Sequence, residues 1–236
     1  MIEVRNVVKT YGKGPSAFTA LNDVSFVVPD GTVVAVVGKS GSGKSTLMHI
    51  MSGLDHPTSG EVLVDGKNLK EMKRKELDAF RSTEMSFIFQ SFFVQGNESC
   101  YDNVALPLEV SEVGYRHRAA RVRKALEGVE LSDKIKQRAK DLSGGQKQRL
   151  AIARAVVGEP KVLFADEPTG NLDSATGEVV QELLFKYAHD NKATLIIVTH
   201  DQDLADKCQM QIHVKDGVIS RIDSATSKQA DEGSTK

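Results

Sequence analysis

Residues 38–45 read Gly38-Lys39-Ser40-Gly41-Ser42-Gly43-Lys44-Ser45 and fit the phosphate-binding loop pattern G-x-x-x-x-G-K-[ST]. A continuous apolar run of strand length, residues 33–37, precedes this loop, and four of its five residues are β-branched valines. Apolar residues follow it at the i, i+3, i+4, i+7 spacing of a helix: Leu47, Ile50, Met51 and Leu54. The sequence therefore predicts a buried strand, a phosphate-binding loop and a helix N-terminus in succession.

Such a loop binds anions because its successive backbone N–H groups form a nest and the helix dipole adds positive potential. Its glycines leave room for phosphates and permit unusual backbone angles. We expect Lys44 to reach the β- and γ-phosphates of a nucleotide and the Ser45 hydroxyl to ligate magnesium. Thr46, the next residue, is counted with the loop as nucleotide-binding. The alternative, a Gly/Ser-rich connector that happens to contain a lysine, does not account for the flanking strand and helix.

The composition limits the class of protein. A chain of 236 residues permits one α/β domain, or one such domain with an inserted lobe. Lys+Arg number 31 and Asp+Glu 32, a net charge of −1, so there is no basic excess of the kind that indicates a nucleic-acid partner. The two cysteines form no CxxC, which favours reduced thiols. No apolar run approaches the length that spans a bilayer, so we expect another polypeptide to provide any membrane attachment.

The remainder of the chain suggests three regions. The first thirty residues alternate apolar and polar, which predicts an antiparallel sheet with one wet face. Residues 91–137 are rich in charged helical patterns, which fits either an inserted helical lobe or further crossover helices of one sheet. Residues 211–219 predict a hairpin with an Asp-Gly turn. Residues 223–236 have the composition of a disordered tail.

Three further apolar runs end in polar residues: one at Gln90, one at Asp166-Glu167 and one at His200. Because parallel sheets carry their chemistry beyond the carboxyl ends of their strands, these ends are expected to converge with the loop on one phosphate. Asp166 would hold magnesium through water, and Glu167 would polarise the attacking water. His200 would hydrogen-bond the γ-phosphate. The simpler alternative is that polar residues merely mark where each buried strand ends. That alternative does not explain why all of these ends carry groups suited to one phosphate.

A second Gly-rich segment begins another predicted helix. Ser143-Gly144-Gly145-Gln146 contains the S-x-x-Q capping box, and the helix runs on to Val157. A glycine-rich helix N-terminus is a second potential anion site. An ordinary well-capped helix would show the same pattern, so this segment by itself leaves both possibilities open.

Taken together, these motifs resemble the ATP-binding subunit of an ABC transporter in both order and spacing, from Ile2 to about Ile222. The resemblance implies an α/β P-loop NTPase core with a mostly parallel sheet, an N-terminal antiparallel β subdomain and a helical subdomain inserted at about residues 91–160. It implies ATP and Mg²⁺ as cofactors. Tyr11 matches the aromatic that stacks on adenine. Gln90 matches the glutamine that links magnesium to the membrane partner. Residues 142–146 match the signature sequence, and Asn171-Leu172-Asp173 matches the loop at the dimer interface.

The resemblance implies a homodimer in the ATP state, and the positions of the two predicted anion sites favour the same arrangement. A phosphate cannot lie on both Gly38–Ser45 and the signature helix of one chain if the helical lobe carries that helix away. Two chains facing head to tail would place each ATP between Lys44 of one chain and Ser143 of the other, together with Gly144, Gly145 and Gln146. The resemblance also implies integral membrane permease subunits as partners, a cytoplasmic location on the inner face of the membrane, and no nucleic acid.

Several segments narrow the resemblance further. Residues 168–173, 103–108 and 198–201 are similar to ATPases of the lipoprotein-release, macrolide-export and cell-division group, whose partners work by mechanotransmission or export. One departure concerns residues 93–98, which are more polar than the apolar run usual in that group. This stretch is expected to face the permease, and its polar residues would pair with a polar segment of an unusual partner.

Three rival classes share part of this pattern. A soluble ABC-type ATPase acting on DNA or ribosomes resembles tandem domains or carries long coiled-coil insertions, and neither is seen in this sequence. A P-loop GTPase needs N-K-x-D, whereas Asn191-Lys192 is followed by Ala193-Thr194. A small-molecule kinase has no need of residues 142–146 or of His200.

Overall fold

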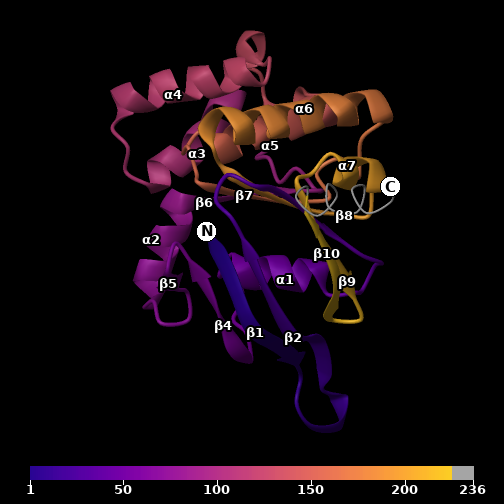
Figure 1. Cartoon of the computed structure of the whole chain (residues 1–236). Coiled ribbons are helices and arrows are strands. Elements are labelled where there is room, and N and C mark those ends of the chain that lie inside the picture. Colours follow the sequence, from indigo (N-terminus) through magenta and orange to yellow (C-terminus); the bar gives the residue numbers. More distant parts are fainter. Residues whose placement is uncertain (225–236) are drawn as a thin grey trace, which may run out of the picture. The chain divides into compact units, whose positions relative to one another are not determined.

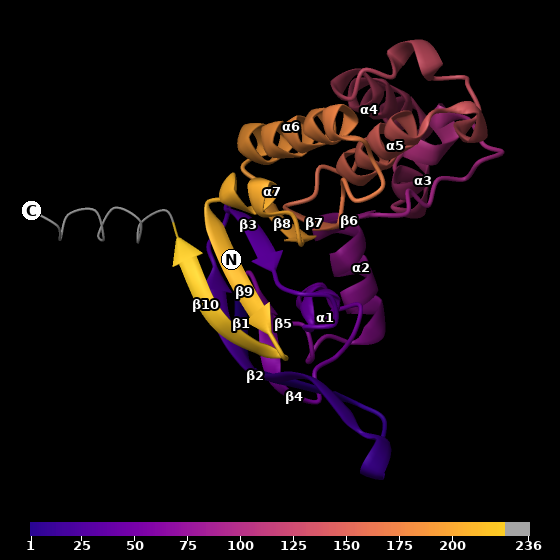
Figure 2. The ribbon, with the colours of Figure 1, turned by 90° about the vertical axis from the view of Figure 1, so that its right-hand side faces the viewer.

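The computed structural model describes residues 1–224 and contains two compact units. The first unit comprises residues 1–78 and the described residues from 196 onward, and the second comprises residues 79–195. Figure 1 labels most of the helices and strands of both units, and Figure 2 also labels β3. Two elements cross the boundary between the units: α2 (Arg74–Glu84) and β8 (Thr194–Thr199).

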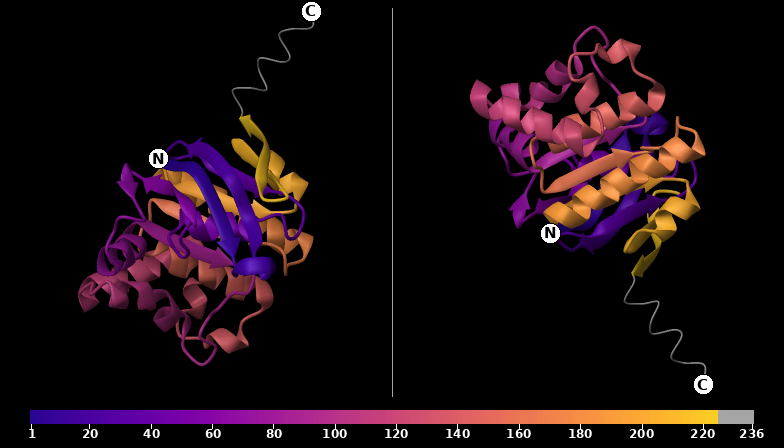
Figure 3. Two further views of the ribbon diagram at one scale, coloured as in Figure 1. Left: turned by 90° about the horizontal axis from the view of Figure 1, so that it is seen from below. Right: turned by 90° about the horizontal axis from the view of Figure 1, so that it is seen from above.

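The first unit contains a four-stranded sheet in the order β2-β1-β4-β5, formed by β2 (Phe18–Val28), β1 (Ile2–Tyr11), β4 (Ser59–Val64) and β5 (Lys67–Asn68). All of its pairings are antiparallel, and Ile2 faces Val28 on one side and Val64 on the other. Ile2, Val28 and Val64 are buried. The antiparallel sheet predicted for the first thirty residues is therefore confirmed. A short 3₁₀ turn, η1 (Gly14–Ser16), joins the two long strands, seen in indigo in Figure 3.

Further strands of the first unit flank the phosphate-binding loop. β3 (Val33–Val37) is buried at every residue, pairs in parallel with β9 (Met210–Lys215) and also neighbours β8. β9 turns back into β10 (Val218–Ser224) through Asp216-Gly217, both with positive φ, so the predicted Asp-Gly hairpin is confirmed. A short helix, α7 (Gln202–Asp206), follows β8. β10 continues to Ser224, two residues past the expected domain end at 222, and residues 225–236 of the expected tail lie outside the described part of the chain.

The helix after the loop, α1 (Lys44–Met51), is shorter than its sequence pattern suggests. Leu47, Ile50 and Met51 are buried as predicted, but Leu54 lies beyond the helix and is 44% exposed. The helix ends because Gly53 takes a left-handed conformation. The Gly53 amide donates to Ile50 O, and the Leu54 amide donates to His49 O. These two hydrogen bonds form a Schellman cap, which turns the chain before Leu54 can join the apolar face.

The second unit pairs two strands in parallel and adds a group of helices. β6 (Met85–Phe89) lies beside β7 (Val162–Asp166), with Phe89 in register with Asp166. The helices are α3 (Cys100–Val110), α4 (Tyr115–Gly128), α5 (Gly144–Val156) and α6 (Ser174–Asn191), with 3₁₀ turns η2 (Ser132–Lys134) and η3 (Ala139–Asp141). Figure 2 shows α3, α4, α5 and α6 gathered together, in agreement with the contacts between them.

The residues expected to form the core of the helical region are mostly buried. Val122, Leu126 and Val129 are almost inaccessible to solvent, whereas Ala125 is half-buried and lines a cavity. α3, α4 and α5 fall inside residues 91–160, the range predicted for a helical insertion; the division into subdomains itself stays a prediction. None of the helices in residues 1–224 combines the length and apolarity needed to cross a bilayer. Cys100 is buried and Cys208 half-buried, and both are free thiols.

Candidate nucleotide-binding site

The predicted phosphate-binding loop is a close turn between β3 and α1 in which two glycines permit contacts with neighbouring backbone. A Cβ on Gly38 would lie 2.2 Å from the Val214 carbonyl oxygen, so no side chain fits there. Gly43 is the N-cap of α1 with φ of 105°, and a Cβ on it would lie 2.6 Å from Ala20 O. The backbone of β2 and β9 therefore restricts these positions to glycine.

Lys44 is a buried cation held by its own loop. The residue is only 8% exposed. Its Nζ donates to the carbonyl oxygens of Gly38 and Lys39, each at 2.9 Å. An ammonium group has three donors, and these two bonds leave one that can point at an anion. A buried ammonium needs compensation by partners, which a phosphate would supply. The predicted role of Lys44 fits this geometry.

The neighbouring hydroxyl groups also suit a phosphate ligand. Ser42 is 5% exposed, and its Oγ is buried with no hydrogen-bond partner in the described structure. Ser45 is exposed at the start of α1, and Thr46 is half-buried beside it. An orphaned buried hydroxyl is costly unless a ligand completes it. The loop thus has an unpaired hydroxyl and a spare ammonium donor that suit a phosphate ligand.

Tyr11 ends β1 and lies in a small polar network of the first unit. Its hydroxyl donates to Asp55 Oδ2 at 2.9 Å, and Lys9 Nζ lies 4.8 Å from the centre of its ring. Lys9 Nζ also donates to Asp55 Oδ1 at 2.6 Å. Burial raises the pKa of the Tyr11 phenol. For Asp55, burial acts to raise the pKa, but the hydrogen bonds from Lys9 and Tyr11 outweigh it, so that the pKa is lowered overall. The network fixes the orientation of a ring that remains 41% exposed.

His200 follows β8 in the first unit and is exposed. The next residue, Asp201, caps α7: its Oδ1 accepts from the Asp203 and Leu204 amides. The Asp201 amide donates in turn to Thr199 Oγ1 at 3.0 Å. These bonds fix the backbone on which His200 sits, while its catalytic role stays a prediction.

In the second unit, the structure brings together the predicted residues at the ends of β6 and β7. Because Phe89 and Asp166 are in register in a parallel pair, Gln90 and Glu167 leave the same edge of it. Gln90 Nε2 donates to Asn171 Oδ1 at 3.2 Å, and Asn171 Nδ2 donates to Gln90 O at 3.0 Å. A Cβ on Gly170 would lie 2.9 Å from Gln90 Nε2. The two amide side chains therefore position one another.

Glu167 has a strained backbone that a neighbouring helix supports. Its φ is 46°, in the left-handed region that glutamate rarely adopts. Gln148 on α5 is completely buried, and its Nε2 donates to Pro168 O at 2.6 Å, which holds the turn immediately after Glu167. Sequence reasoning missed Gln148. The available signal was a glutamine on the apolar face of the predicted helix 144–157.

The signature segment has the predicted capping box. The Ser143 amide donates to Gln146 Oε1 at 3.0 Å, and the Gln146 amide donates to Ser143 Oγ at 3.3 Å. Ser143 and Gly144 are exposed, so the helix N-terminus is accessible. Asp173 caps α6 by accepting from the Thr176 amide and hydroxyl, and these backbone and side-chain bonds lower the pKa of its carboxyl group. Asp173 therefore has a structural role in one chain, alongside its predicted place at a dimer interface.

The polar segment after Gln90 is fixed by two side chains: Arg154, which sequence reasoning missed, and Asn103, the first residue of the segment 103–108. Arg154 donates to Phe93 O at 2.7 Å and to Phe92 O at 3.1 Å, and burial lowers the pKa of its guanidinium. Asn103, 1% exposed, accepts from the Gln95 amide and donates to Gln95 O. Phe93 has φ of 46° and is 67% exposed. The backbone of this segment is thus held in place, while the Phe93 ring contacts the Phe89 ring edge-on and stays largely exposed.

The donor types predicted for magnesium are oxygen groups: the Ser45 hydroxyl, the Gln90 amide and, through water, Asp166. Residues 1–224 hold no cluster of three or more His, Cys, Asp or Glu side chains that could bind a metal without a ligand.

A parallel strand, a phosphate-binding loop and a helix with a buried lysine define a P-loop nucleotide-binding protein of the α/β class. The model of the ABC transporter family matches residues 21–170. The lipoprotein-releasing system ATP-binding protein LolD of Syntrophus aciditrophicus is 40% identical over 93% of this chain and 98% of its own length. The macrolide export ATP-binding/permease protein MacB of Bdellovibrio bacteriovorus is 39% identical over 93% of this chain, but only 33% of its own length is covered.

Solved structures agree with these sequence relatives. A dimeric, post-hydrolysis state of the ATP-binding cassette MJ0796 bound to ADP and Pi has a TM-score of 0.87 and 37% identity, covering 95% of this chain and 98% of its own. The chain belongs to the ABC transporter family, and it is an ATP-binding subunit with the ATPase fold. The predicted α/β P-loop fold is confirmed, and the alternative of an ATPase acting on nucleic acid is not supported.

Proposed function

We propose that two copies of this chain bind two ATP molecules with Mg²⁺ in a head-to-tail dimer, and that closing and hydrolysis drive a separate membrane permease. The observation that carries the proposal is the buried Lys44, held on two loop carbonyls with a donor to spare. Membership of the ABC transporter family supplies the ATPase activity, and the dimeric MJ0796 cassette bound to ADP and Pi supports the assembly.

In this proposal, the residues of each chain bind ATP, hold the magnesium ion and activate the attacking water. Lys44 and the loop amides bind the phosphates, and Tyr11 stacks on adenine. Ser45 and Gln90 hold magnesium, with Asp166 acting through water; the ion neutralises charge on the phosphates. Glu167 orients and polarises the attacking water, and His200 hydrogen-bonds the γ-phosphate. The strained turn at Glu167, held by Gln148, fixes the direction of the carboxylate.

The second chain completes each site. The exposed N-terminus of α5 offers Ser143, Gly144 and Gly145 with the positive end of the helix dipole to a phosphate held elsewhere. Asn171 and Asp173 lie on the loop that would follow the partner's surface. Hydrolysis at Glu167 removes the γ-phosphate between the two chains, so the dimer opens. The attached membrane subunits then return to the conformation they had before ATP bound.

Two variants separate binding from hydrolysis. Lys44→Ala should weaken ATP binding about 10- to 100-fold, because it removes charge-assisted hydrogen bonds to phosphate. Glu167→Gln should keep ATP binding and slow hydrolysis about 10²- to 10⁴-fold. Glu178→Gln, an exposed glutamate on α6, is the matched control and should change neither. Fluorescent-nucleotide binding and phosphate release measure the two quantities, and tight ATP binding by Lys44→Ala would overturn the assignment.

The permease is proposed as a separate polypeptide on whose cytoplasmic face this chain sits. The MacB relative is an ATP-binding/permease protein, and this chain covers only a third of its length. The rigid, partly exposed segment at residues 93–98 is our candidate for the contact. Its polar character fits a polar segment of the permease.

Charge reversal tests that contact. Glu98→Lys should reduce stimulation of ATP hydrolysis by the co-purified membrane protein and leave basal hydrolysis unchanged, because Glu98 is exposed. Glu182→Lys on the exposed side of α6 is the control. Full stimulation of the Glu98→Lys variant would count against this surface. Stimulation by nucleic acid instead of a membrane protein would count against the permease as partner.

A further inference from the structure

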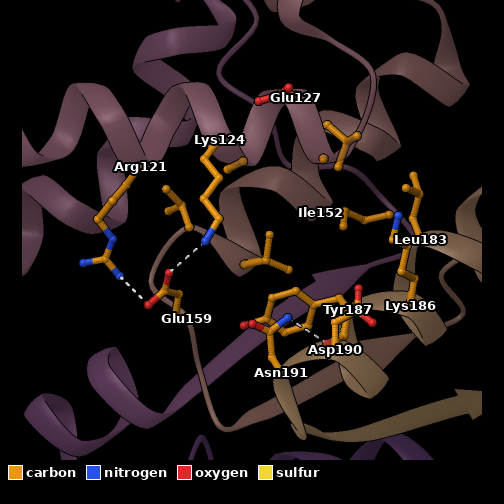
Figure 4. Close-up of a pocket in the computed structure, with 15 residues that line it drawn as sticks. Arg121, Lys124, Glu127, Ile152, Glu159, Leu183, Lys186, Tyr187, Asp190 and Asn191 are labelled. Atoms are coloured by element: carbon orange, nitrogen blue, oxygen red, sulfur yellow. Dashed lines mark hydrogen bonds and ion pairs between the residues drawn. The ribbon is translucent and has the colours of Figure 1, made fainter.

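The second unit contains a cavity that uses none of the residues assigned above. It has a volume of about 350 Å³ and lies between α4, α5 and α6 (Figure 4). This volume falls in the range of small-molecule sites, about 300–1,000 Å³. Its floor is apolar, formed by Ala125, Val129, Ile152, Val156, Val157 and Leu183.

The rim of the cavity carries three cations and three carboxylates, and two of the cations share one carboxylate. Arg121 and Lys124 both extend from α4 toward Glu159, and each lies 3.8 Å from a different oxygen of its carboxylate (Figure 4). Two cations thus share one anion at a distance too long for hydrogen bonds. Glu159 itself has a φ of 54°, an unfavourable conformation for glutamate in the loop after α5.

A phenol completes the polar side of the cavity. The Tyr187 hydroxyl donates one long hydrogen bond, 3.4 Å to Pro160 O. It can therefore donate a shorter hydrogen bond to a ligand or accept one from it. Burial, and then the Glu159 carboxylate, raise the pKa of this phenol to about 12, so it stays protonated at neutral pH. Lys186 adds a third cation to the rim, and Glu127 and Asp190 add two further carboxylates, so the excess of positive charge is local to Arg121 and Lys124.

We propose that this cavity binds a small anionic amphiphile: an apolar body that fills the α4–α5–α6 floor, and one acidic group that takes the place of Glu159 between Arg121 and Lys124. The apolar floor is the reason for proposing an apolar body. The two cations that share one carboxylate are the reason for proposing an acidic group on the ligand. A neutral ligand of equal size would leave both cations on their long contacts. A polyanion such as a nucleotide would place a strongly hydrated base and ribose on an aliphatic floor.

Decanoate is the probe, and decan-1-ol is the matched neutral control, because the two share a chain and differ in charge. Displacement of the fluorescent dye 1-anilinonaphthalene-8-sulfonate from the full-length protein reports binding of each. Decanoate should bind at one site per chain, about tenfold more tightly than decanol. Ala125→Phe, which fills the floor, should abolish displacement by both while the melting temperature shows that the variant is folded.

Two charge variants are expected to act in opposite directions. Lys124→Gln should weaken decanoate binding about fivefold, whereas Glu159→Gln should strengthen it by a similar factor because it frees both cations. Arg123→Gln, an exposed arginine on the same helix that does not line the cavity, should have no effect. Equal binding of decanoate and decanol, or weaker binding in Glu159→Gln, would overturn the proposal.

Discussion

Tyr11, which we propose stacks on adenine, is held by contacts with Asp55 and Lys9. Asp55 fixes the hydroxyl, and the Lys9 ammonium lies 4.8 Å from the ring centre. A ring held in this way loses little conformational freedom on binding a base.

Removal of the Tyr11 ring should therefore weaken ATP binding more than removal of its hydroxyl. Tyr11→Ala should cost about 1–3 kcal/mol, or about 5- to 150-fold in affinity, because it removes base stacking. Tyr11→Phe should cost less than about fivefold, since only a partly exposed hydrogen bond is lost. Titration with a fluorescent ATP analogue measures both. Tyr115→Ala, an aromatic 70% exposed on α4, is the control. Equal losses in Tyr11→Ala and Tyr11→Phe would contradict stacking.

Among the secondary-structure elements, α5 and α6 begin against one another. A Cβ on Gly145 would lie 2.2 Å from Thr176 Cγ2, while the Thr176 hydroxyl is tied to Asp173. The signature glycine therefore does more than expose a helix N-terminus. It allows the first turn of α5 to approach the first turn of α6, which carries the loop with Asn171.

Gly145→Ala tests this close packing. Alanine gains about 1 kcal/mol of helix propensity over glycine, but overpacking costs about 1–3 kcal/mol, so the variant should be less stable. Thr176→Ser removes Cγ2 and keeps the hydroxyl on Asp173, so the double variant should recover most of the loss. Urea denaturation measures the free energy of unfolding. Failure of Thr176→Ser to rescue the variant would show that the contact does not limit the packing.

For the whole molecule, the sequence predicted the elements that have a local signal. The loop, the capping box at Ser143 and the Asp-Gly hairpin each depend on a few adjacent residues, and each was confirmed. Leu54 was placed wrongly because the cap at Gly53 overrides the apolar spacing. Gln148, Asp55 and Arg154 were missed because their partners are distant in sequence: Pro168, Tyr11 and the Phe92-Phe93 carbonyls.

The cavity between α4, α5 and α6 could not be read from the sequence for a related reason. Ala125 and Val129 fit the apolar stripe of a core helix, and nothing in their spacing distinguishes a packed face from one that lines a hollow. Glu159 and its two cations lie more than thirty residues apart in the chain. Only the fold brings that carboxylate next to Arg121 and Lys124.

The central claim is that one chain holds the triphosphate and a second chain completes the site with its signature helix. Light scattering on the Glu167→Gln variant, with and without Mg²⁺ and ATP, tests it most directly. We expect a monomer without ATP, twice the monomer mass with Mg²⁺ and ATP, and a monomer again when Ser143→Arg is added to the variant. A Glu167→Gln variant that binds ATP with Mg²⁺ and stays monomeric would contradict it.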